Sequence, residues 1–422
     1  MRVNLKRRRL LKVVRCGKLI DGRGGKAIEN ALIVMDGSKI IEVGYEKDVD
    51  LPKDNFEELD CSKMTVLPGL IDPHLHLALG PGSTYEEMFQ CSDGLQLSSG
   101  IVNAQMTLES GVTTARDCGG RNRTTLDLRA AEQRGFIVAP RLLVSGPPIT
   151  MTGGHFNFCN GEADGSDAVR RMTRQLLKDG VDFIKLMASG GGTKATRREL
   201  PSYTAEELKV AVEETHRQGR TVAAHCHATE AIINAVEAGV DTIEHCTFME
   251  PHGESRKHVF REDIAEKMAQ KGICADNVLV SMTDKERLEW SFDNFEKLRK
   301  IGVKVLPGTD GLRLYETAGL ALVLEMMVRG GSSPMEAILS ATSLVAKALK
   351  VEGTVGSLEP GKEADLIAVQ GNPIEDISVL RAPKLVMKRG ILVPSSGRNE
   401  ARVKADTLRK QVLSMLEALG ID

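Results

Sequence analysis

Aromatic residues and excess charge of either sign are both scarce in this sequence. Phe, Trp and Tyr make up 4% of the 422 residues, and the formal net charge is −2. A chain this close to neutral provides no broad positive surface to attract nucleic acid or an acidic membrane. Nor does any apolar run approach the roughly 18 residues that a membrane span needs. We therefore expect a small molecule as the partner, and neither nucleic acid nor a membrane.

Paired cysteine motifs and a signal peptide are also missing. The eight cysteines are scattered, with no CxxC spacing among them. The first residues, MRVNLKRRRLLKVV, are basic, but the apolar run that follows is short and Lys12 interrupts it, unlike the core of a signal peptide. We interpret this segment as a charged extension that leads into a strand. The cysteines of such a chain are expected to be reduced, mostly buried thiols in a cytoplasmic protein.

The central part of the chain alternates between short β-rich runs and helical patterns, which Gly and Pro separate. The predicted strands are TVLPGLIDPHLHL, VTTARDC, PRLLVSG, DFIKLMASG, TVAAHCH, DTIEHC, ICADNVLV and VKVLPGTD. The spacing of Thr204 and Glu207 predicts a capping box at the start of one of the intervening helices. These strand–helix units predict an α/β fold, a (β/α)8 TIM barrel over residues 67–350. A doubly wound open sheet is the alternative, although no G-x-G-x-x-G turn follows the first strand.

The two ends of the chain have a different pattern, in which apolar and polar residues alternate between Gly-rich turns. This pattern is typical of antiparallel strands and hairpins. Neither end has enough strands for a core of its own, so residues 1–66 and 351–396 are predicted to form one small β-sandwich together. Residues 397–422 are predicted to form a C-terminal packing helix, because one face carries Leu408, Val412, Met415 and Leu419.

Residues able to bind a metal gather at the ends of the predicted strands. In a barrel these ends converge on one mouth, where the chemistry takes place. Two histidine pairs with i, i+2 spacing end the first and fifth strands, and this spacing points both rings of a pair to the same side. The whole set comprises His74, His76, Lys185, His225, His227, His245 and Asp310, with Asp117 and His155 close to the ends of the second and third strands.

Each of these residues taken alone has an ordinary structural explanation. A single histidine at a strand end is more often a packed core or rim residue than a ligand, and a single aspartate often caps the next helix. The joint pattern favours a metal site, because five of the nine histidines occupy predicted strand ends. Chance would scatter them over helix surfaces, where His216, His252 and His258 are expected.

Several motifs resemble those of the amidohydrolase superfamily of metal-dependent hydrolases: PGLIDPHLHL, DFIKLMASGG, AAHCHATE, DTIEHC and LPGTD, in this order. The tail GSLEPGKEADLIAV resembles the returning β-sandwich segment of that superfamily, and the resemblance covers about residues 15–395. TTARDCGG, TMTGGH, and HCH followed by EH resemble the imidazolonepropionase-like branch. That branch includes Xaa-Pro dipeptidases, related carboxypeptidases and ochratoxinase-type amidases.

This resemblance implies a binuclear metal centre whose ligands are His74, His76, Lys185, His225, His245 and Asp310. The first-strand pair would bind one metal, and the other two histidines would bind the second. CO2 would convert Lys185 to a carbamate that bridges both ions. His227 would then face the pocket as a substrate-binding residue and not as a primary ligand.

Such a centre suits the hydrolysis of an amide. Two metals can supply a bridging hydroxide at neutral pH and can polarise the carbonyl. Asp310 would take the proton of the hydroxide and pass it to the leaving nitrogen, while His155 or His227 would donate a hydrogen bond to the developing oxyanion. Imidazole and carboxylate ligands suit zinc, with manganese or cobalt as alternatives.

Other functions are compatible with parts of the pattern. HATE, from His227 to Glu230, resembles the H-x-x-E spacing of single-metal deaminases in this superfamily, although such sites do not need Lys185. A cyclic-amide hydrolase of the imidazolone type is a further alternative. A non-enzymatic relative would usually lack some of the ligands, and none is missing here.

The neighbours of the ligands are expected to support the site and not to react. Strand alternation turns Cys226 and Cys246 away from the pocket, so both are interpreted as buried packing residues. Asp72 and Glu244 could orient ligand imidazoles. For Glu244 the alternation argues against this role, and packing against a helix is as plausible.

The predicted rim after the fourth strand, GGGTKATRRELPSYT, is basic. Lys194, Arg197, Arg198 and Tyr203 could meet a substrate carboxylate, a task that suits arginine, or they could belong to a solvated loop. The favoured function is hydrolysis of an amide bond in a small substrate such as a dipeptide or an N-acyl amino acid with a free carboxylate. We also expect a homo-oligomer.

Overall fold

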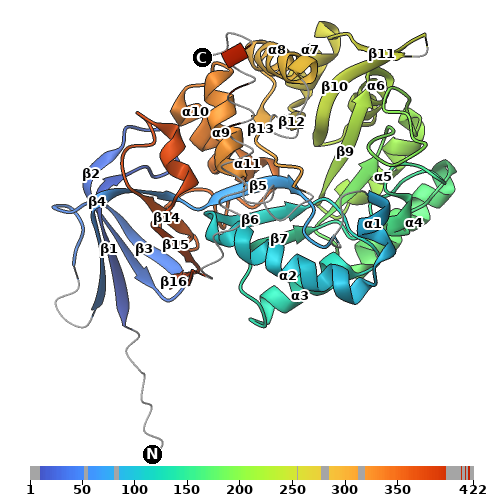
Figure 1. Ribbon diagram of the computed structural model, residues 1–422. Helices are drawn as coiled ribbons and strands as arrows, with labels where there is room; N and C mark the ends of the chain where they lie inside the picture. The colour runs from blue at the N-terminus through green and yellow to red at the C-terminus, as the bar shows by residue number, and fades with distance from the viewer. Residues whose placement is uncertain are drawn as a thin grey trace, which may run out of the picture.

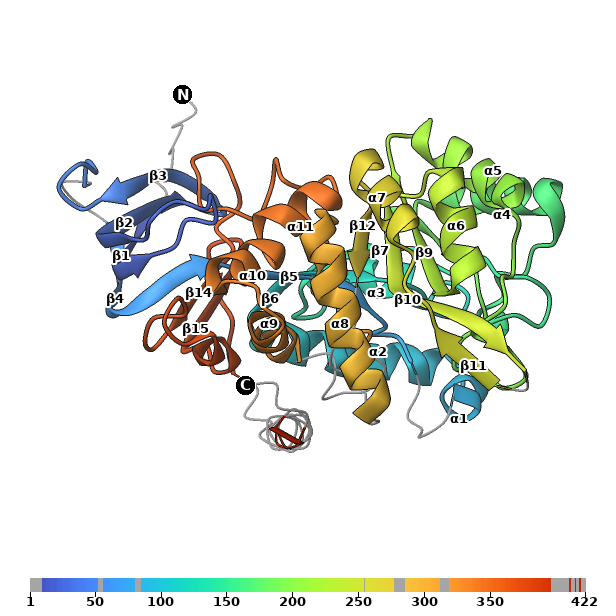
Figure 2. The same cartoon turned by 90° about the horizontal axis from the view of Figure 1, so that it is seen from above.

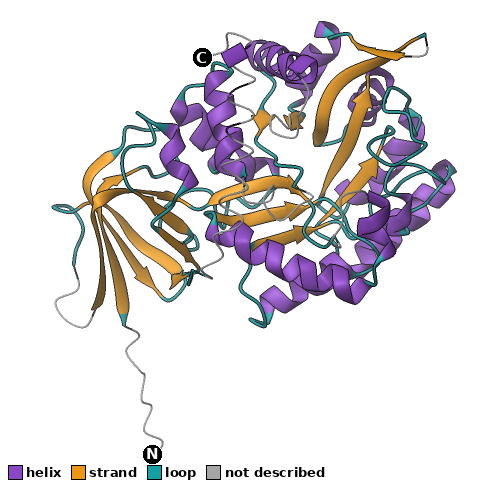
Figure 3. Ribbon diagram, viewed as in Figure 1, coloured by secondary structure: helices purple, strands orange, loops and turns teal. Residues whose placement is uncertain are grey.

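The computed structural model describes residues 10–51, 56–79, 85–253, 255–276, 285–311 and 319–395, together with residues 410, 414, 417 and 418. Two parts are visible in Figures 1 and 3: a β-sheet built from the two ends of the chain, and an α/β part made from the residues between them. Almost all of the predicted C-terminal helix, 397–422, lies outside the described residues. No described helix is both long enough and apolar enough to cross a membrane.

The two chain ends share one seven-stranded sheet, in the order β16–β15–β14–β4–β1–β2–β3. Its strands are β1 (Leu11–Leu19), β2 (Ile28–Asp36), β3 (Lys39–Tyr45), β4 (Phe56–Pro68), β14 (Leu366–Val369), β15 (Leu385–Lys388) and β16 (Ile391–Leu392). Antiparallel pairing of β4 with β14 joins the N-terminal and C-terminal strands, as the sequence predicts.

The predicted β-sandwich is present only in part, because these strands belong to one sheet and not to two. The sheet folds over, so that the Ile40 amide donates to the Lys362 carbonyl at 3.0 Å and the Ile40 carbonyl accepts from the Gly361 amide at 2.8 Å. Inside the fold lies an apolar cluster that includes Ile33 and Leu366. Burial of this cluster is what holds the folded sheet together.

Among the described residues, the middle of the chain forms eight parallel strands in two sheets. One sheet contains β5 (Leu70–Leu75), β6 (Val112–Asp117) and β7 (Arg141–Val144), and the other contains β8 (Phe183–Met187), β9 (Thr221–Ala228), β10 (Thr242–His252), β12 (Cys274–Asp276) and β13 (Val305–Leu306). The continuous ladder of the predicted closed barrel is therefore not found in the described part of the chain. Isolated parallel bridges link the two sheets at both seams, between Ile149 and Leu186 and between Leu75 and Gly311.

Helices alternate with these parallel strands and pack along the outside of the sheets (Figure 2). Their bounds are α1 (Tyr85–Gln90), α2 (Asp93–Glu109), α3 (Thr124–Gln133), α4 (Gly165–Asp179), α5 (Ala205–His216), α6 (Thr229–Ala238), α7 (Glu262–Lys271), α8 (Lys285–Ile301), α9 (Leu320–Arg329), α10 (Pro334–Ser340) and α11 (Ser343–Ala348). The predicted capping box at the start of α5 is present, with Thr204 and Glu207 each accepting from the backbone amide of the other.

Two of the differences between the predicted and the observed strands change the course of the chain. The run TVLPGLIDPHLHL is split at Gly69, where a Cβ would stand 2.1 Å from Thr113 Oγ1. The backbone passes too close to β6 for any side chain, and this glycine carries the chain from the end sheet into β5. DTIEHC is longer than predicted, because β10 continues to His252 and forms a hairpin with β11 (Ser255–His258).

A buried ion pair attaches the end sheet to the α/β part. Lys388 Nζ of β15 lies 2.5 Å from Glu132 Oε1 of α3 and 2.7 Å from the Ala139 carbonyl oxygen. The side chain of Glu132 is 2% exposed and that of Lys388 is 11% exposed. Arg389 also pairs with Glu132, at 3.2 Å, so this carboxylate joins α3 to the end of β15 through two cations.

Candidate metal centre

The histidines predicted at strand ends meet at the carboxyl ends of the parallel strands. Their rings are close neighbours: the ring centres are 5.6 Å apart for His74 and His76, 5.2 Å for His74 and His245, and 4.6 Å for His225 and His245. Each of these residues is 8% exposed or less. Three strands, β5, β9 and β10, therefore contribute to a single buried group of imidazoles, counting the residue after β5 with that strand.

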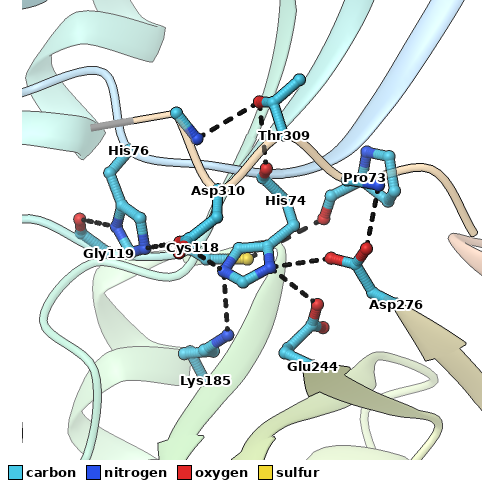
Figure 4. Close-up of polar contacts among 12 residues, drawn as sticks. Pro73, His74, His76, Cys118, Gly119, Lys185, Glu244, Asp276, Thr309 and Asp310 are labelled. Carbon is cyan, nitrogen blue, oxygen red and sulfur yellow. Dashed lines mark hydrogen bonds and ion pairs between the residues drawn. The ribbon is translucent and has the colours of Figure 1, made fainter. Parts of the chain in front are cut away.

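One set of potential ligand atoms comes from His74, His76 and Asp310 (Figure 4). Asp310 Oδ1 lies 3.2 Å from His74 Nε2 and 3.6 Å from His76 Nε2. The Gly119 carbonyl lies 2.9 Å from His76 Nδ1, so this nitrogen carries the proton. Burial, followed by the charge on His74, holds the pKa of His76 well below its usual value.

The neutral His76 ring therefore presents the lone pair of Nε2 to the carboxylate of Asp310 without a proton between them. Two acceptors that face each other in a buried site repel unless a cation lies between them. Burial raises the pKa of Asp310, and the charges of His74 and Lys185 offset this effect only in part. The donor set thus fits a divalent metal ion.

A second set comes from His225, His227 and His245, whose potential ligand atoms lie within 4.8 Å of one another. Burial and the charges of the neighbouring imidazoles hold the pKa values of His225 and His245 well below the usual range. Both rings are therefore neutral and able to offer a lone pair. His227 lies as close to this set as its neighbours do, so the geometry alone does not separate ligand from substrate residue. Its Nδ1 lies 3.0 Å from Thr247 Oγ1.

Lys185 joins the first set from β8. Its side chain is 1% exposed, and Nζ lies 3.5 Å from His74 Nε2. No carboxylate of the described residues forms an ion pair with this ammonium group. An ammonium group buried without an ion-pair partner is costly, and this cost is an argument that Lys185 works in another chemical form.

Two buried carboxylates contact His74 at Nδ1, the ring nitrogen that faces away from the other candidate ligands. Only one of them, Glu244, was considered from the sequence. Asp276 Oδ2 accepts a hydrogen bond from His74 Nδ1 at 2.7 Å, and Glu244 Oε2 lies 3.1 Å from the same nitrogen (Figure 4). Burial alone would raise the pKa of Glu244, but Lys185 and Arg116 hold it well below its usual range. Burial, and then Glu244, raises the pKa of Asp276 to about 7. These contacts leave Nε2 of His74 to face the ligand set.

Of the two roles that the sequence left open for Glu244, the contact with His74 supports orientation of an imidazole. The alternation that argued against this role fails, because β10 is not a regular strand. His245, Cys246 and Phe248 all have positive φ values, of 66°, 49° and 49°, and the pairing with β9 shifts register between His245 and Met249. As a result both Glu244 and the adjacent His245 contact the ring of His74. Strained backbone of this kind is often found at functional sites.

Arg116 also received no role from the sequence, although this residue lies in the motif TTARDCGG. It is 1% exposed, and its guanidinium donates to Glu244 Oε1 at 2.7 Å and to Thr242 Oγ1 at 3.2 Å. It stacks over Phe183 at 5.0 Å. Arg116 thereby balances the charge of Glu244 in the interior. Asp276, in β12, was missed because the predicted strand ICADNVLV placed it mid-strand, away from the strand ends at which ligands were sought.

Two aspartates near the candidate ligands, Asp72 and Asp117, accept hydrogen bonds from backbone amides and form no described contact with an imidazole. Asp72 accepts from the Thr309 hydroxyl at 2.7 Å and from the His74 amide at 3.0 Å, so the prediction that it orients an imidazole was wrong. Asp117 accepts from the Gly119 amide at 3.0 Å. Burial raises the pKa of Asp72 and of Asp117 to about 7. Both residues shape the loops that carry the ligands.

His155 lies against the second ligand set, at 4.6 Å from the ring centre of His225. Its Nδ1 lies 2.8 Å from Thr193 Oγ1. A Cβ at Gly191 would stand 2.3 Å from the His155 ring, so the loop after β8 passes directly over this histidine. The sequence placed His155 near the site but offered no sign of the loop that packs on it.

The four rim residues proposed for substrate binding are not equivalent. Tyr203 is 4% exposed, and its hydroxyl donates to the Ala163 carbonyl at 2.8 Å, which is a packing contact. Arg197 pairs with Glu199 at 2.7 Å. Arg198 is half-buried. Burial dominates the pKa values of His155 and Asp310, but the charge of Arg198 acts on both, whereas Lys194 is exposed.

The cysteines beside the ligand histidines are packing residues, as predicted. Cys226 and Cys246 are both 0% exposed. Burial raises the pKa of each thiol well above its usual value. Neutral, enclosed thiols of this kind are unreactive. All of the cysteines lack disulfide partners, and all except Cys91 are buried.

Comparisons with known proteins agree with this geometry. The model of the amidohydrolase family matches residues 65–393. Ochratoxinase from Aspergillus niger is 30% identical over 427 residues, a match that covers 89% of this chain and 84% of ochratoxinase. A crystal structure of a Xaa-Pro dipeptidase with methionine bound in its active site superimposes with a TM-score of 0.81 and 31% identity, over 90% of this chain and 99% of that one. A 5′-deoxyadenosine deaminase from Methanosarcina acetivorans is 26% identical over 81% of this chain and 80% of that protein.

We predict that Asp276→Asn weakens metal binding. The variant keeps the size of the side chain but removes the charge that supports His74 Nδ1, and loss of such a partner typically lowers metal affinity about 10–100-fold. Competition with a chromophoric chelator would measure the change. Asp263→Asn, at a surface aspartate that pairs with Arg261, is the matched control. Equal affinities for the two variants would contradict the role given to Asp276.

Proposed function

This chain belongs to the amidohydrolase family, and from that premise we propose that it hydrolyses the amide bond of a small substrate with two divalent metal ions. The observation that carries the proposal is the lone pair of His76 Nε2 facing the Asp310 carboxylate at 3.6 Å. A site that neither binds a cation nor reacts has no reason to bury this unfavourable contact. The neighbouring imidazole set supplies donors for a second ion.

The proposed ligands divide into two groups. His74, His76 and Asp310 would hold one ion, and His225 and His245 the other. Imidazole and carboxylate donors suit zinc, although manganese or cobalt would also be accepted. When bound, such ions activate water and polarise the scissile carbonyl.

Lys185 would serve both groups as a carbamate. Its neutral amine attacks CO2, the new N–C bond forms, and one proton leaves to solvent. This converts a cation that lacks an ion-pair partner among the described carboxylates into an anion with two oxygen donors. The buried position, 3.5 Å from His74 Nε2, is then favourable and not costly.

The other side chains would handle protons and charge. Asp310, whose pKa burial raises, can accept a proton on Oδ1 and return it to the leaving nitrogen. His155 and His227 can donate hydrogen bonds to the carbonyl oxygen as negative charge develops on it. Their fixed positions, against Thr193 and Thr247 respectively, mean that little reorganisation is needed.

The substrate class follows from the charge at the rim. Arg198 is the rim cation whose charge acts on both His155 and Asp310, and arginine binds carboxylates in a bidentate manner. A solved Xaa-Pro dipeptidase relative holds methionine, an amino acid with a free carboxylate, in its active site. We therefore favour a dipeptide or an N-acyl amino acid. That the protein is cytoplasmic and a homo-oligomer stays a prediction.

Deamination is an alternative function, because one relative, 26% identical to this chain, is a 5′-deoxyadenosine deaminase. In the sequence, the feature that favoured deamination was the H-x-x-E spacing of His227 and Glu230. In the structure Glu230 is exposed on the first turn of α6, a position that does not favour contact with a buried substrate. Hydrolysis of a cyclic amide would use the same ligands and is distinguished only by the substrate tested.

The two histidines of β9 should respond differently to replacement. We expect the parent protein, purified without chelators, to contain between one and two equivalents of divalent metal. His225→Ala should lose metal and rate together, because it removes a ligand. His227→Ala should lose rate and keep metal, because it removes a substrate contact. Elemental analysis beside turnover measures both, and the reverse outcome would show that His227 is the ligand.

Lys185→Ala should bind metal poorly and be nearly inactive, because the bridging anion is lost. Acetate or propionate should restore part of both by filling the gap with a small carboxylate, whereas chloride at equal ionic strength should not. Retention of two metal equivalents by Lys185→Ala would rule out the bridging role. Analysis of metal content makes this test independent of the choice of substrate.

Substrates with a free carboxylate should react better than their amidated counterparts. A charge-assisted hydrogen bond contributes about 1.5–3 kcal/mol, so we expect about a 10–100-fold difference in kcat/KM. Arg198→Gln should abolish this preference, while Lys194→Gln, at an exposed position in the same loop, should retain it. If the parent enzyme shows no preference for the free acid, the carboxylate proposal fails while amide hydrolysis itself stands.

A further inference from the structure

A second cavity, of about 340 Å³, lies at the opposite end of the parallel strands from the histidines. It is lined by residues that come directly before strands, namely Asp241 before β10, Ile273 before β12 and Lys304 before β13. The proposed ligands instead lie within the parallel strands or after them, farther along the chain direction. This volume is within the range of about 300–1,000 Å³ that small-molecule sites occupy.

The cavity is strongly basic. Its lining includes the four lysines 271, 304, 347 and 350 and a single carboxylate, Asp241. Asp241 is already occupied, since one oxygen lies 2.8 Å from His216 Nε2 and accepts from the Val222 amide at 2.7 Å. None of the four lysines forms an ion pair with a described carboxylate. The four lysines are exposed to solvent, and their positive charge exceeds the negative charge of the described carboxylates around them.

Helix ends explain part of this charge but not all of it. Lysine in the last turn of a helix is a common way to offset the helix dipole, and Lys271 and Lys347 occupy such positions in α7 and α11. Lys271 donates to the Val236 carbonyl at 2.7 Å. Lys304 and Lys350 lie outside any helix. Lys350, however, directly follows the C-cap Leu349 of α11 and donates to the Gly219 carbonyl at 3.5 Å, so Lys304 is the lysine that neither a helix end nor a described hydrogen bond explains.

An adjacent cavity of about 200 Å³ continues the same basic surface. It shares Lys350 with the first cavity and adds Arg220. Its one carboxylate, Asp182, is paired with Arg129 and also accepts from the Val144 amide. Arg220 donates to the Val181 carbonyl and does not neutralise an acid among the described residues. In both cavities the carboxylate already has partners within the chain, whereas the four lysines and Arg220 form no ion pair with a described carboxylate. Arg116, which also lines the smaller cavity, is paired with Glu244.

We propose that the lysine-lined cavity at the amino-terminal ends of β10, β12 and β13 binds a small anion that carries two or more negative charges. Lys304 and Lys347 would hold the anion from two sides of the cavity, with Lys271 and Lys350 completing the ring of charge. Phosphate, sulfate and polycarboxylate groups share this chemistry. The site is separate from the candidate metal centre and does not depend on the proposed function.

Calorimetric titration of the metal-loaded protein would test the proposal with two weakly chelating probes, sulfate and benzene-1,3,5-tricarboxylate, at constant ionic strength. Both should bind saturably at one site. The double variant Lys304→Gln/Lys347→Gln should weaken binding at least tenfold. Lys209→Gln/Lys267→Gln removes the same charge from exposed positions on α5 and α7, outside the cavity lining, and should bind like the parent.

Equal binding by the two double variants would overturn the proposal, as would heats that never saturate. Binding that disappears in His225→Ala and persists in the Lys304/Lys347 variant would also overturn it, because the anion would then sit at the metal centre. Unfolding measured by circular dichroism shows whether each variant is folded. A variant that does not fold is replaced by Lys304→Gln alone, for which we expect weakening of at least threefold.

Discussion

Much of this structure depends on the contact between the imidazole of His74 and the two carboxylates behind it. Asp276 and Glu244 both lie within 3.1 Å of Nδ1, so Nε2 must face the other ligands. The contact joins β5, β10 and β12, and Arg116 adds β6 through its bond to Glu244. Charges that are costly to bury are therefore paired in a network that also fixes the relative positions of four strands.

This network explains why the candidate site contains strained backbone in β10 and yet holds its side chains in fixed positions. The left-handed residues that follow Glu244 in β10 would be unfavourable in an ordinary strand. Here they allow neighbouring residues, Glu244 and His245, to approach the same imidazole. Asp72 and Asp117 also fix the backbone near the ends of β5 and β6, because their carboxylates accept hydrogen bonds from backbone amides. Preorganisation of this kind is what a metal centre requires of its protein.

The two ends of the parallel strands have opposite electrostatic character. At the carboxyl ends, the neutral imidazoles of His76, His225 and His245 and the carboxylate of Asp310 offer lone pairs that suit cations. At the amino-terminal ends, lysines exceed the acids available to pair with them. Arg116 reaches from the smaller basic cavity to Glu244, so a continuous path of polar contacts runs from one end toward the other. The shared scaffold is rigid because its interior is filled with paired charges and packed apolar residues.

The sequence by itself determined the ligand candidates and the division of the chain. Histidines with i, i+2 spacing, the strand–helix alternation and the motif order predicted the family, and the match to residues 65–393 confirms it. The pairing of the two chain ends was also predicted correctly. These features are readable because they depend on local spacing and on the polar–apolar period of each segment.

Only the tertiary structure decided how the ligands are supported. Asp276 and Arg116 reach His74 and Glu244 across gaps of 202 and 128 residues in the chain, and no local pattern encodes such contacts. The strained backbone that follows Glu244 accompanies a contact with His74 against which strand alternation had argued. The hydroxyl of Tyr203, which the sequence proposed for substrate binding, donates instead to the Ala163 carbonyl. Spacing along a chain predicts which side of a strand a residue occupies only while the backbone stays regular, and at this site it does not.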